Sequence, residues 1–293
     1  MELTSDHLRK LESIAIEAAT RAGEMIQSKA KSNHEIIHKK GGSSLASQVV
    51  TAIDLESQRL ILETLNDTFK SFELGLLTEE SPDDSSRHQH DYFWCIDPLD
   101  GTLAFTKGTA GYSVSIALVS RHGNPLIGIV FDPDTSTLYH AIFSQGAQKN
   151  GVAWEVPIPT SSSPLALMID NSFITRANEP TFRDQLETFA KQRGFPGTKT
   201  INYAGAVLNA CWVVDHAPSL YSKFPKPNPG GGSVWDFAAT TCLFSELGLP
   251  ASDINGAPLQ LNPIGKTYMN RKGILFASSP DLAKAKRMPL RFI

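Results

Sequence analysis

Apolar residues near the N-terminus recur every three or four positions, which is the spacing of one face of a helix. Thr4, Ser5 and Asp6 precede this stretch, and their side chains can cap the first turn of a helix. The pattern predicts a first helix whose apolar stripe is Leu8, Leu11, Ile14, Ala15, Ala18, Ala22, Met25 and Ile26. A second amphipathic stretch runs from residue 49 to about residue 69.

Shorter apolar segments follow this amphipathic stretch. Segment 74–77 is a short apolar run, and segment 92–96 has the character of a strand. Segment 112–119 alternates in the way that predicts a half-buried strand, and segments 126–131 and 137–143 continue as strands after a His-Gly-Asn turn. These segments predict an antiparallel meander that is preceded by helices.

The pattern changes after a segment rich in proline and serine at residues 157–164. Helix and strand then alternate, with helices expected over segments 182–193 and 204–215. The periodicity alone predicts a mixed α/β protein with two sheets. We therefore expect one compact unit with two halves, an α+β half over residues 1–157 and an α/β half over residues 158–293.

The composition is that of a globular protein, because 41% of the 293 residues are hydrophobic and 19% are charged. A net charge of −3 does not favour binding to a nucleic-acid polymer, although a single nucleotide remains compatible as a substrate. No apolar run approaches the ~20 residues that a membrane helix needs, and residues 1–10 lack a signal-peptide core. We therefore expect a cytoplasmic protein that does not bind membranes. Cys95, Cys211 and Cys242 lie in apolar runs and are expected to be buried free thiols.

The most informative stretch is Trp-Cys-Ile-Asp-Pro-Leu-Asp-Gly-Thr at residues 94–102. Asp97 and Asp100 follow a strand-like segment, and Pro98 favours an extended backbone at Asp97. Carboxylates are preferred ligands of hard cations such as Mg²⁺, and the amides of Gly101 and Thr102 could receive a phosphate. An Asp-Gly pair alone would predict only a turn.

Three further blocks accompany this motif: Val-Val-Thr-Ala-Ile-Asp ending at Asp54, Leu-Thr-Glu-Glu around Glu79, and Ser-Val-Trp-Asp ending at Asp236. In this order and spacing, the four blocks resemble the inositol monophosphatase superfamily, and the resemblance runs from about Leu11 to Ser278. That superfamily consists of Mg²⁺-dependent, lithium-sensitive phosphatases that act on inositol phosphates, 3′(2′),5′-bisphosphate nucleotides and sugar phosphates.

The resemblance implies an α/β (α+β) fold, namely a layered α-β-α-β-α sandwich of the inositol monophosphatase and sugar phosphatase type, with the site where the halves meet. Two or three Mg²⁺ ions would be held by Glu79, Asp97, the carbonyl of Leu99, Asp100 and Asp236. Asp54 and Thr102 would orient and deprotonate the attacking water. The amides of Gly101 and Thr102 would face the phosphate, and Gly205 with Ala206 would meet the leaving group.

Lys223 stands where inositol monophosphatases commonly carry a glutamate that accepts hydrogen bonds from ring hydroxyls. A lysine attracts anions instead, which favours a substrate with a second phosphate; the alternative is a solvated surface lysine. Asn209 replaces a basic residue that is frequent in nucleotidases, and Thr78 replaces the usual glycine, which should alter only the local turn. Gln48 replaces an acidic or small residue near the third metal site, and segment 225–232 is an insertion.

The sequence thus favours a Mg²⁺-dependent phosphatase whose partner is a small phosphorylated metabolite, with 3′(2′),5′-bisphosphate nucleotidase as the leading activity. An inositol-1-monophosphatase is the nearest alternative, and a non-catalytic sensor of the same fold is the second. A sensor would not need both Asp54 and Thr102. A homodimer is compatible with the resemblance. No phosphate-binding P-loop and no Gly-x-Ser-x-Gly motif occurs, so neither an ATPase nor a serine hydrolase is supported.

Overall fold

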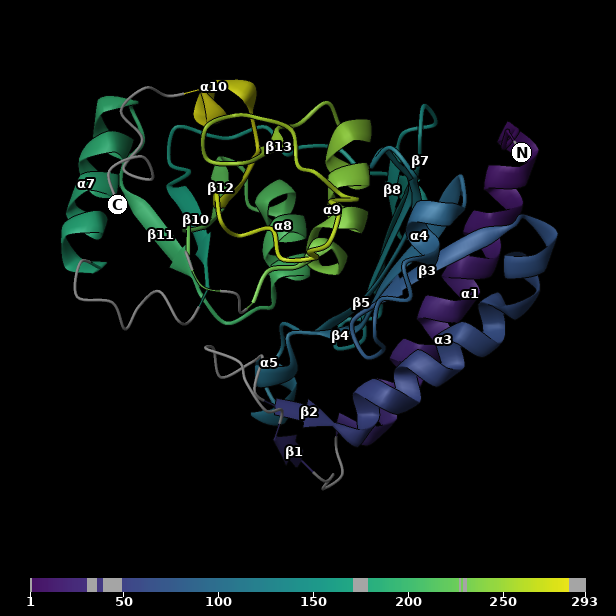
Figure 1. Cartoon of the computed structure of the whole chain (residues 1–293). Helices are drawn as coiled ribbons and strands as arrows, with labels where there is room; N and C mark the ends of the chain where they lie inside the picture. The colour runs from purple at the N-terminus through teal and green to yellow at the C-terminus, as the bar shows by residue number, and fades with distance from the viewer. Residues whose placement is uncertain are drawn as a thin grey trace.

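The computed structural model describes residues 2–30, 36–38, 49–170, 179–226, 228 and 231–284. Helices and sheets alternate in five layers across the molecule, as Figure 1 shows. This arrangement confirms the predicted α-β-α-β-α sandwich. None of the described helices combines the length and the apolar character needed to cross a membrane.

The first layer consists of two long helices, α1 (Ser5–Ala30) and α3 (Ala52–Ser71), which pack side by side (Figure 1). The hydroxyl of Thr4 accepts a hydrogen bond from the backbone N–H of His7 at 3.3 Å, so Thr4 caps α1 as the sequence predicts. Most of the predicted apolar stripe of α1 is buried against the adjacent sheet. A short antiparallel pair of strands, β1 (Ile36–His38) and β2 (Val49–Thr51), lies between the two helices in the chain.

The second layer is a seven-stranded sheet in the order β3-β4-β5-β6-β7-β8-β9. Its first pair is parallel and every later pair is antiparallel, so the predicted meander is confirmed. The strands are β3 (Leu74–Thr78), β4 (Tyr92–Asp100), β5 (Ser113–Ser120), β6 (Pro125–Asp132), β7 (Thr137–Ile142), β8 (Ala147–Lys149) and β9 (Val152–Ala153). Two short helices, α4 (Ser86–Gln89) and α5 (Thr102–Thr106), flank β4 in the chain.

The alternation over segment 112–119 predicts a half-buried strand. In the structure this strand, β5, is buried on both faces. Val114, Ile116 and Leu118 of β5 lie in the apolar cluster beneath α1. The small residues between them face α9 (Val234–Glu246), where the Ser115 hydroxyl donates a hydrogen bond to the carbonyl of Trp235 at 3.4 Å. Small residues let the helix approach closely, so here the alternation reflects residue size instead of contact with water.

Strand β4 continues to Asp100, beyond the segment 92–96 that the sequence predicts. Its pairing with β5 shifts register between Asp97 and Asp100, which is the signature of a β-bulge. Pro98 has no N–H for the ladder, and the N–H of Leu99 donates to the Asp97 carboxylate at 3.1 Å. The bulge therefore places both carboxylates on the end of a strand.

The remaining layers form the C-terminal half. Helices α8 (Ala206–Asp215) and α9 lie between the two sheets, and α7 (Glu179–Gln192) with α10 (Pro280–Ala283) lies on the outer side (Figure 1). Helix α8 begins two residues after the predicted start, because Gly205 is extended and caps it. The second sheet has the order β11-β10-β12-β14-β13 and consists of β10 (Leu165–Ile169), β11 (Thr198–Ile201), β12 (Ser219–Lys223), β13 (Ala251–Ser252) and β14 (Ile274–Ala277).

Asp215, at the end of α8, ties this half to the first sheet. Its carboxylate accepts hydrogen bonds from the Tyr139 hydroxyl at 2.9 Å, the Lys149 ammonium at 2.8 Å and the Trp154 indole N–H at 3.1 Å. Cys95, Cys211 and Cys242 are buried and free, which confirms the expectation for the thiols. The predicted boundary at residue 157 falls in the coil between β9 and β10.

Close packing of α9 on the first sheet depends on Gly128 in β6. A Cβ atom at this position would lie 2.4 Å from the carbonyl oxygen of Ala239 and 2.8 Å from Cβ of Cys242. We expect Gly128→Ala to lower the free energy of unfolding by about 1–3 kcal/mol, because the helix must move away from the sheet. Urea unfolding followed by circular dichroism measures this change.

Gly197→Ala is the matched control, because its added Cβ would meet only the flexible carboxylate of Glu187, at 3.2 Å. Its effect should stay within about 0.5 kcal/mol. Equal losses of stability in the two variants would contradict the packing argument.

Candidate active site

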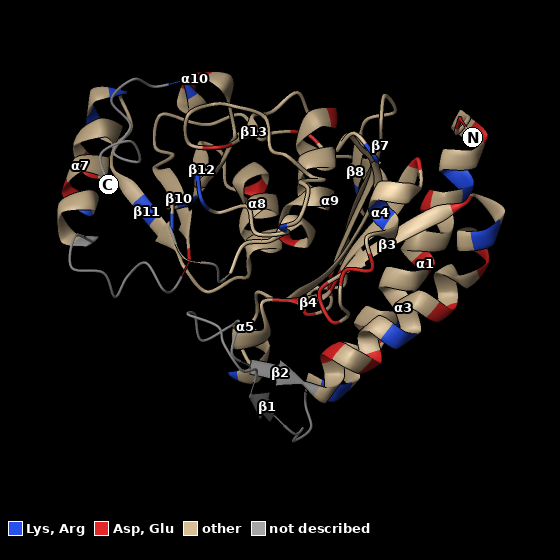
Figure 2. Ribbon diagram, viewed as in Figure 1, with Lys and Arg blue, Asp and Glu red and all other residues tan. Residues whose placement is uncertain are grey.

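Three carboxylates converge where the bulged end of β4 meets the start of α9. Asp97, Asp100 and Asp236 each offer an oxygen, and these oxygens all lie within 4.8 Å of one another. Asp97 and Asp100 are buried, whereas Asp236 is partly exposed. Figure 2 shows red acidic segments where β4 runs toward α5. Residues distant in the sequence therefore form one acidic cluster.

Burial and mutual repulsion make this cluster reluctant to ionise. Burial raises the pKa of Asp97 well above its ordinary value, and the neighbouring carboxylates raise it further. Burial and the Asp236 carboxylate raise the pKa of Asp100 to about 7. A bound cation would relieve this repulsion, so the electrostatics favour a cation-binding site.

The N-terminus of α8 holds the Asp100 carboxylate in place. One oxygen accepts a hydrogen bond from the N–H of Ala206 at 3.1 Å, and the other accepts one from Val207 at 2.8 Å. A Cβ atom on Gly205 would lie 2.2 Å from the same carboxylate, so only glycine fits there. Gly205 and Ala206, predicted to meet the leaving group, thus lie directly against a predicted metal ligand.

Asp236 occupies the first turn of α9. Its carboxylate accepts a hydrogen bond from the N–H of Ser233 at 2.5 Å, which is one half of a capping box. Burial raises the pKa of Asp236, and the Lys223 ammonium partly offsets this effect. The helix start therefore fixes the orientation of the third carboxylate.

Glu79 and Asp54 approach the cluster from two other elements. The N–H of Glu79, the residue after β3, donates to the carbonyl of Ile96 at 3.2 Å, which extends the β3–β4 pairing up to Asp97. Asp54 lies in the first turn of α3 and is 3% exposed. Both carboxylates raise the pKa of Asp97, so all five predicted acidic residues act on one region.

Gly101 and Thr102 form the turn into α5. Gly101 has a φ of +80°, and a Cβ atom on it would lie 2.4 Å from the carbonyl oxygen of Gly111, so glycine is required. The hydroxyl of Thr102 donates to the carbonyl of Leu99 at 3.2 Å, which joins two predicted site groups. The role of Thr102 as a proton carrier stays a prediction.

Lys223 is 9% exposed, so the alternative of a solvated surface lysine is wrong. Its ammonium lies 2.9 Å from the Asp170 carboxylate, which also accepts a hydrogen bond from the Tyr221 hydroxyl at 3.2 Å. Burial would lower the pKa of Lys223, but Asp170, Asp236 and Asp100 raise it above its ordinary value. The ammonium is therefore charged, and two carboxylates of the acidic cluster are close enough to stabilise that charge.

Asp170 is a residue of the site that was not predicted from the sequence. It directly follows the apolar run of β10, just as Asp97 follows the apolar part of β4. An acidic residue directly after an apolar, strand-like run is therefore the sequence signal that could have identified Asp170. Gln48 and three residues of the insertion at 225–232 lie outside the described residues.

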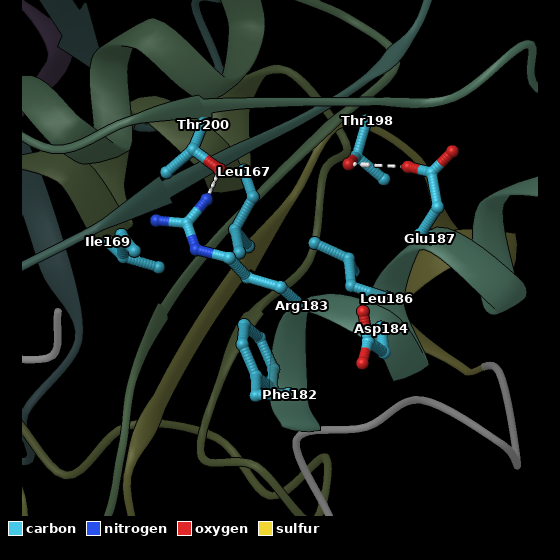
Figure 3. Close-up of a pocket in the computed structure, with 9 residues that line it drawn as sticks. All are labelled: Leu167, Ile169, Phe182, Arg183, Asp184, Leu186, Glu187, Thr198 and Thr200. Carbon is cyan, nitrogen blue, oxygen red and sulfur yellow. Dashed lines mark hydrogen bonds between the residues drawn. The ribbon is translucent and has the colours of Figure 1, made fainter. Parts of the chain in front are cut away.

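A pocket of about 230 Å³ lies elsewhere, between α7 and strands β10 and β11 (Figure 3). Arg183 extends across it, and its guanidinium donates a hydrogen bond to the hydroxyl of Thr200 at 3.0 Å. Leu167 and Ile169 line this pocket, whereas Met168 and Asp170, which alternate with them along the chain, point to the other side of the sheet. The pocket and the carboxylates thus lie on opposite faces.

The carboxylates fit Mg²⁺ better than a soft metal, because hard cations take oxygen ligands. The three carboxylate oxygens of the cluster are close enough to bind one ion. The raised pKa values of Asp97 and Asp100 mean that a nearby positive charge would stabilise their ionised forms. None of the described histidines or cysteines joins the cluster.

We compared the chain with known protein families, curated proteins and solved structures. A model of the inositol monophosphatase family matches residues 7–289. The 3′(2′),5′-bisphosphate nucleotidase CysQ of Escherichia coli K12 is 29% identical over 216 residues, which cover 73% of this chain and 80% of CysQ. The Nus factor SuhB of the same strain is 29% identical over 292 residues, covering 95% of this chain and 94% of SuhB. The solved inositol monophosphatase of Anabaena (Nostoc) sp. PCC 7120 has a TM-score of 0.69 at 23% identity, covering 98% and 97% of the two chains, and supports the fold.

The raised pKa of Asp100 predicts how stability depends on pH. A carboxyl whose pKa is higher in the folded than in the unfolded state binds more protons when folded, so stability falls as pH rises between about 4 and about 7. Metal-free protein should therefore melt at a higher temperature at pH 5.5 than at pH 7.5. Mg²⁺ should remove the difference by replacing protons as the neutralising charge.

Thermal unfolding in excess chelator, with Asp100→Asn as the matched variant, measures this effect. The variant should show a smaller difference between the two pH values. A parent protein whose melting temperature rises no more than that of the variant between pH 7.5 and pH 5.5 would contradict the assignment of the acidic cluster.

Proposed function

Because this chain belongs to the inositol monophosphatase family, we propose that it is a Mg²⁺-dependent phosphate monoester hydrolase. The convergence of Asp97, Asp100 and Asp236 is the observation that carries the proposal. Glu79, Asp97, the carbonyl of Leu99, Asp100 and Asp236 would hold the ions. Bound Mg²⁺ would supply charge neutralisation on the phosphate and its leaving oxygen, and would acidify water.

The remaining site residues act on the water and the phosphate. Asp54, buried near Asp97, accepts the proton that the attacking water loses, with the Thr102 hydroxyl as the group that passes it on. The amides of Gly101 and Thr102 lie at a helix start, where N–H groups have no partner within the helix and can orient phosphate oxygens. Fixed donors and a fixed base together favour in-line attack.

For the substrate, we propose a 3′(2′),5′-bisphosphate nucleotide, with adenosine 3′,5′-bisphosphate as the test compound. The name of the relative CysQ, a 3′(2′),5′-bisphosphate nucleotidase, supports this choice. The charged ammonium of Lys223 beside the acidic cluster supports it as well, because a second phosphate would gain a charge-assisted hydrogen bond there.

Inositol 1-phosphate is the second candidate, and Asp170 is the observation that favours it. Its carboxylate lies 2.9 Å from the Lys223 ammonium and can accept hydrogen bonds from hydroxyl groups, as a polyol requires. The pair as a whole is neutral, so a second phosphate must compete with Asp170 for Lys223. The solved relative from Anabaena is an inositol monophosphatase.

A non-catalytic role is the third candidate, because SuhB carries the name of a Nus factor. A protein that only binds a metabolite has no need of both Asp54 and Thr102 beside the metal ligands. Phosphate release from adenosine 3′,5′-bisphosphate, inositol 1-phosphate and fructose 1,6-bisphosphate, with Mg²⁺ and with excess chelator, separates the three candidates. Turnover that persists in excess chelator would overturn the proposed metal dependence.

Replacing a metal ligand should abolish catalysis while keeping the shape of the side chain. We expect Asp97→Asn or Asp236→Asn to lower kcat at least ~10³-fold at saturating Mg²⁺, about 4 kcal/mol of barrier, because each removes a charge that holds the ion. Asp67→Asn on the exposed side of α3 is the control and should leave kcat unchanged. A kcat within tenfold of the parent would show that the replaced residue is not a ligand.

The variant Lys223→Glu distinguishes between the two candidate substrates. If Lys223 meets a second phosphate, the variant replaces attraction by repulsion, and a charge-assisted contact alone is worth about 1.5–3 kcal/mol. Efficiency on adenosine 3′,5′-bisphosphate should then fall at least ~100-fold, mostly through KM, because the contact is remote from the scissile bond. Efficiency on inositol 1-phosphate should change little.

The measurement is kcat/KM for both substrates in the parent and the variant. Equal losses on the two substrates would mean that Lys223 only balances Asp170 and Asp236. A parent that prefers inositol 1-phosphate would overturn the nucleotidase activity and leave the phosphatase proposal standing.

A further inference from the structure

One face of α3 carries three buried polar residues that reach three parts of the site. Asp54, Ser57 and Gln58 are spaced by three and four positions, so they share a face of the helix, and they are 3%, 0% and 8% exposed. Asp54 acts on Asp97 directly. The other two have no assigned role.

Gln58 binds both ends of the loop that carries Glu79. Its amide oxygen accepts a hydrogen bond from the hydroxyl of Thr78 at 2.7 Å, and its amide nitrogen donates to the hydroxyl of Ser81 at 2.9 Å. Glu79 and Glu80 are the only residues between these two contacts. The amide therefore fixes the turn from which the Glu79 carboxylate extends.

Ser57 holds the backbone of strand β4 next to Asp97. Its hydroxyl donates a hydrogen bond to the carbonyl of Pro98 at 2.7 Å, and the bond is buried. Pro98 lies between Asp97 and Leu99, at the β-bulge that displaces the two carboxylates of β4. The helix face thus holds the backbone beside Asp97 as well as the loop of Glu79.

The Thr78–Gln58 bond also corrects the expectation that Thr78 alters only the local turn. A glycine at this position has no side chain for Gln58 to bind, whereas Thr78 is 3% exposed and bonded. Burying an amide and two hydroxyls is costly unless each is hydrogen-bonded. An apolar side chain would cover the same space, so the network suggests a role beyond filling it.

We infer that Ser57 and Gln58 are positioning residues that set the separation between the Glu79 and Asp97 carboxylates and thereby the affinity for the metal. This inference rests on the proposed function, because it assigns both carboxylates to one metal site. Hydrogen-bonded partners that orient metal ligands typically contribute 10–100-fold to metal affinity. The effect here is expected on the binding of the ion, before any substrate is present.

The test measures Mn²⁺ binding from the electron paramagnetic resonance signal of the free ion, without substrate. Gln58→Met keeps the volume and removes both hydrogen bonds, and Thr78→Val removes one of them. We expect the Mn²⁺ dissociation constant to rise about 10–100-fold in Gln58→Met and less in Thr78→Val. The double variant should bind about as weakly as Gln58→Met alone, because the two residues act through one contact.

Thr68→Val is the matched control. Thr68 is also a buried polar residue of α3, and it accepts a hydrogen bond from the Trp94 indole of β4 at 2.9 Å. It lies 14 residues after Asp54, which is about 21 Å along the helix. Its replacement should lower the melting temperature and leave Mn²⁺ affinity unchanged, so lost stability and lost positioning are told apart.

Three outcomes decide the inference. Weaker Mn²⁺ binding in Gln58→Met and Thr78→Val, but not in Thr68→Val, would support it even if no substrate were hydrolysed. Affinity within threefold of the parent in both site variants would overturn it and leave the proposed function intact. A parent that binds no Mn²⁺ would overturn the proposed function and this inference together. Should Gln58→Met not fold, Thr78→Val with Ser81→Ala provides the same comparison.

Discussion

Repulsion among buried carboxylates is the constraint on which the rest of this structure depends. Two like charges 4 Å apart repel by about 4 kcal/mol at an effective dielectric constant of ~20, and three such groups lie close together here. The polypeptide offsets only part of this repulsion, through the first amides of α8 and the ammonium of Lys223. The remaining demand for positive charge is what a divalent cation can meet.

Helix α8 contributes to this site through contacts at both of its ends. Its positive N-terminus meets the Asp100 carboxylate, an arrangement that the helix dipole favours. Its negative C-terminus carries Asp215, which the dipole disfavours, and the ammonium of Lys149 offsets that charge. The Tyr139 hydroxyl and the Trp154 indole also bind Asp215. The helix that stabilises the site is therefore anchored to the first sheet at its far end, so the two halves cannot separate without loosening Asp100.

Local patterns in the sequence predict the helices and strands of a mixed α/β protein with two sheets. The meander and the first helix are examples of this kind. The layered arrangement and the acidic residues of the candidate site were predicted from the resemblance to the inositol monophosphatase superfamily. The burial of β5 on both faces could not be read locally, because it depends on α9, more than 100 residues away. The division of the chain into halves at residue 157 stays a prediction. The sequence left both a site lysine and a surface lysine open for Lys223 for a similar reason, since its partner Asp170 follows another strand, β10.

The register of the second sheet explains the pair of Asp170 and Lys223. Strands β10 and β12 are parallel, and Ile169 lies opposite Ser222, so Asp170 and Lys223 follow side by side at the same ends of the two strands. Only this non-local pairing allows a lysine to be buried, because a lone ammonium would lose its charge instead. The site therefore has two regions of different character. The carboxylates of β4 and α9 are only partly compensated and favour a cation, whereas the neighbouring pair of Asp170 and Lys223 is balanced and would suit either a phosphate or a hydroxyl. Under the proposed function, the balanced region would select the substrate, since the cation-binding region would serve any phosphate ester alike.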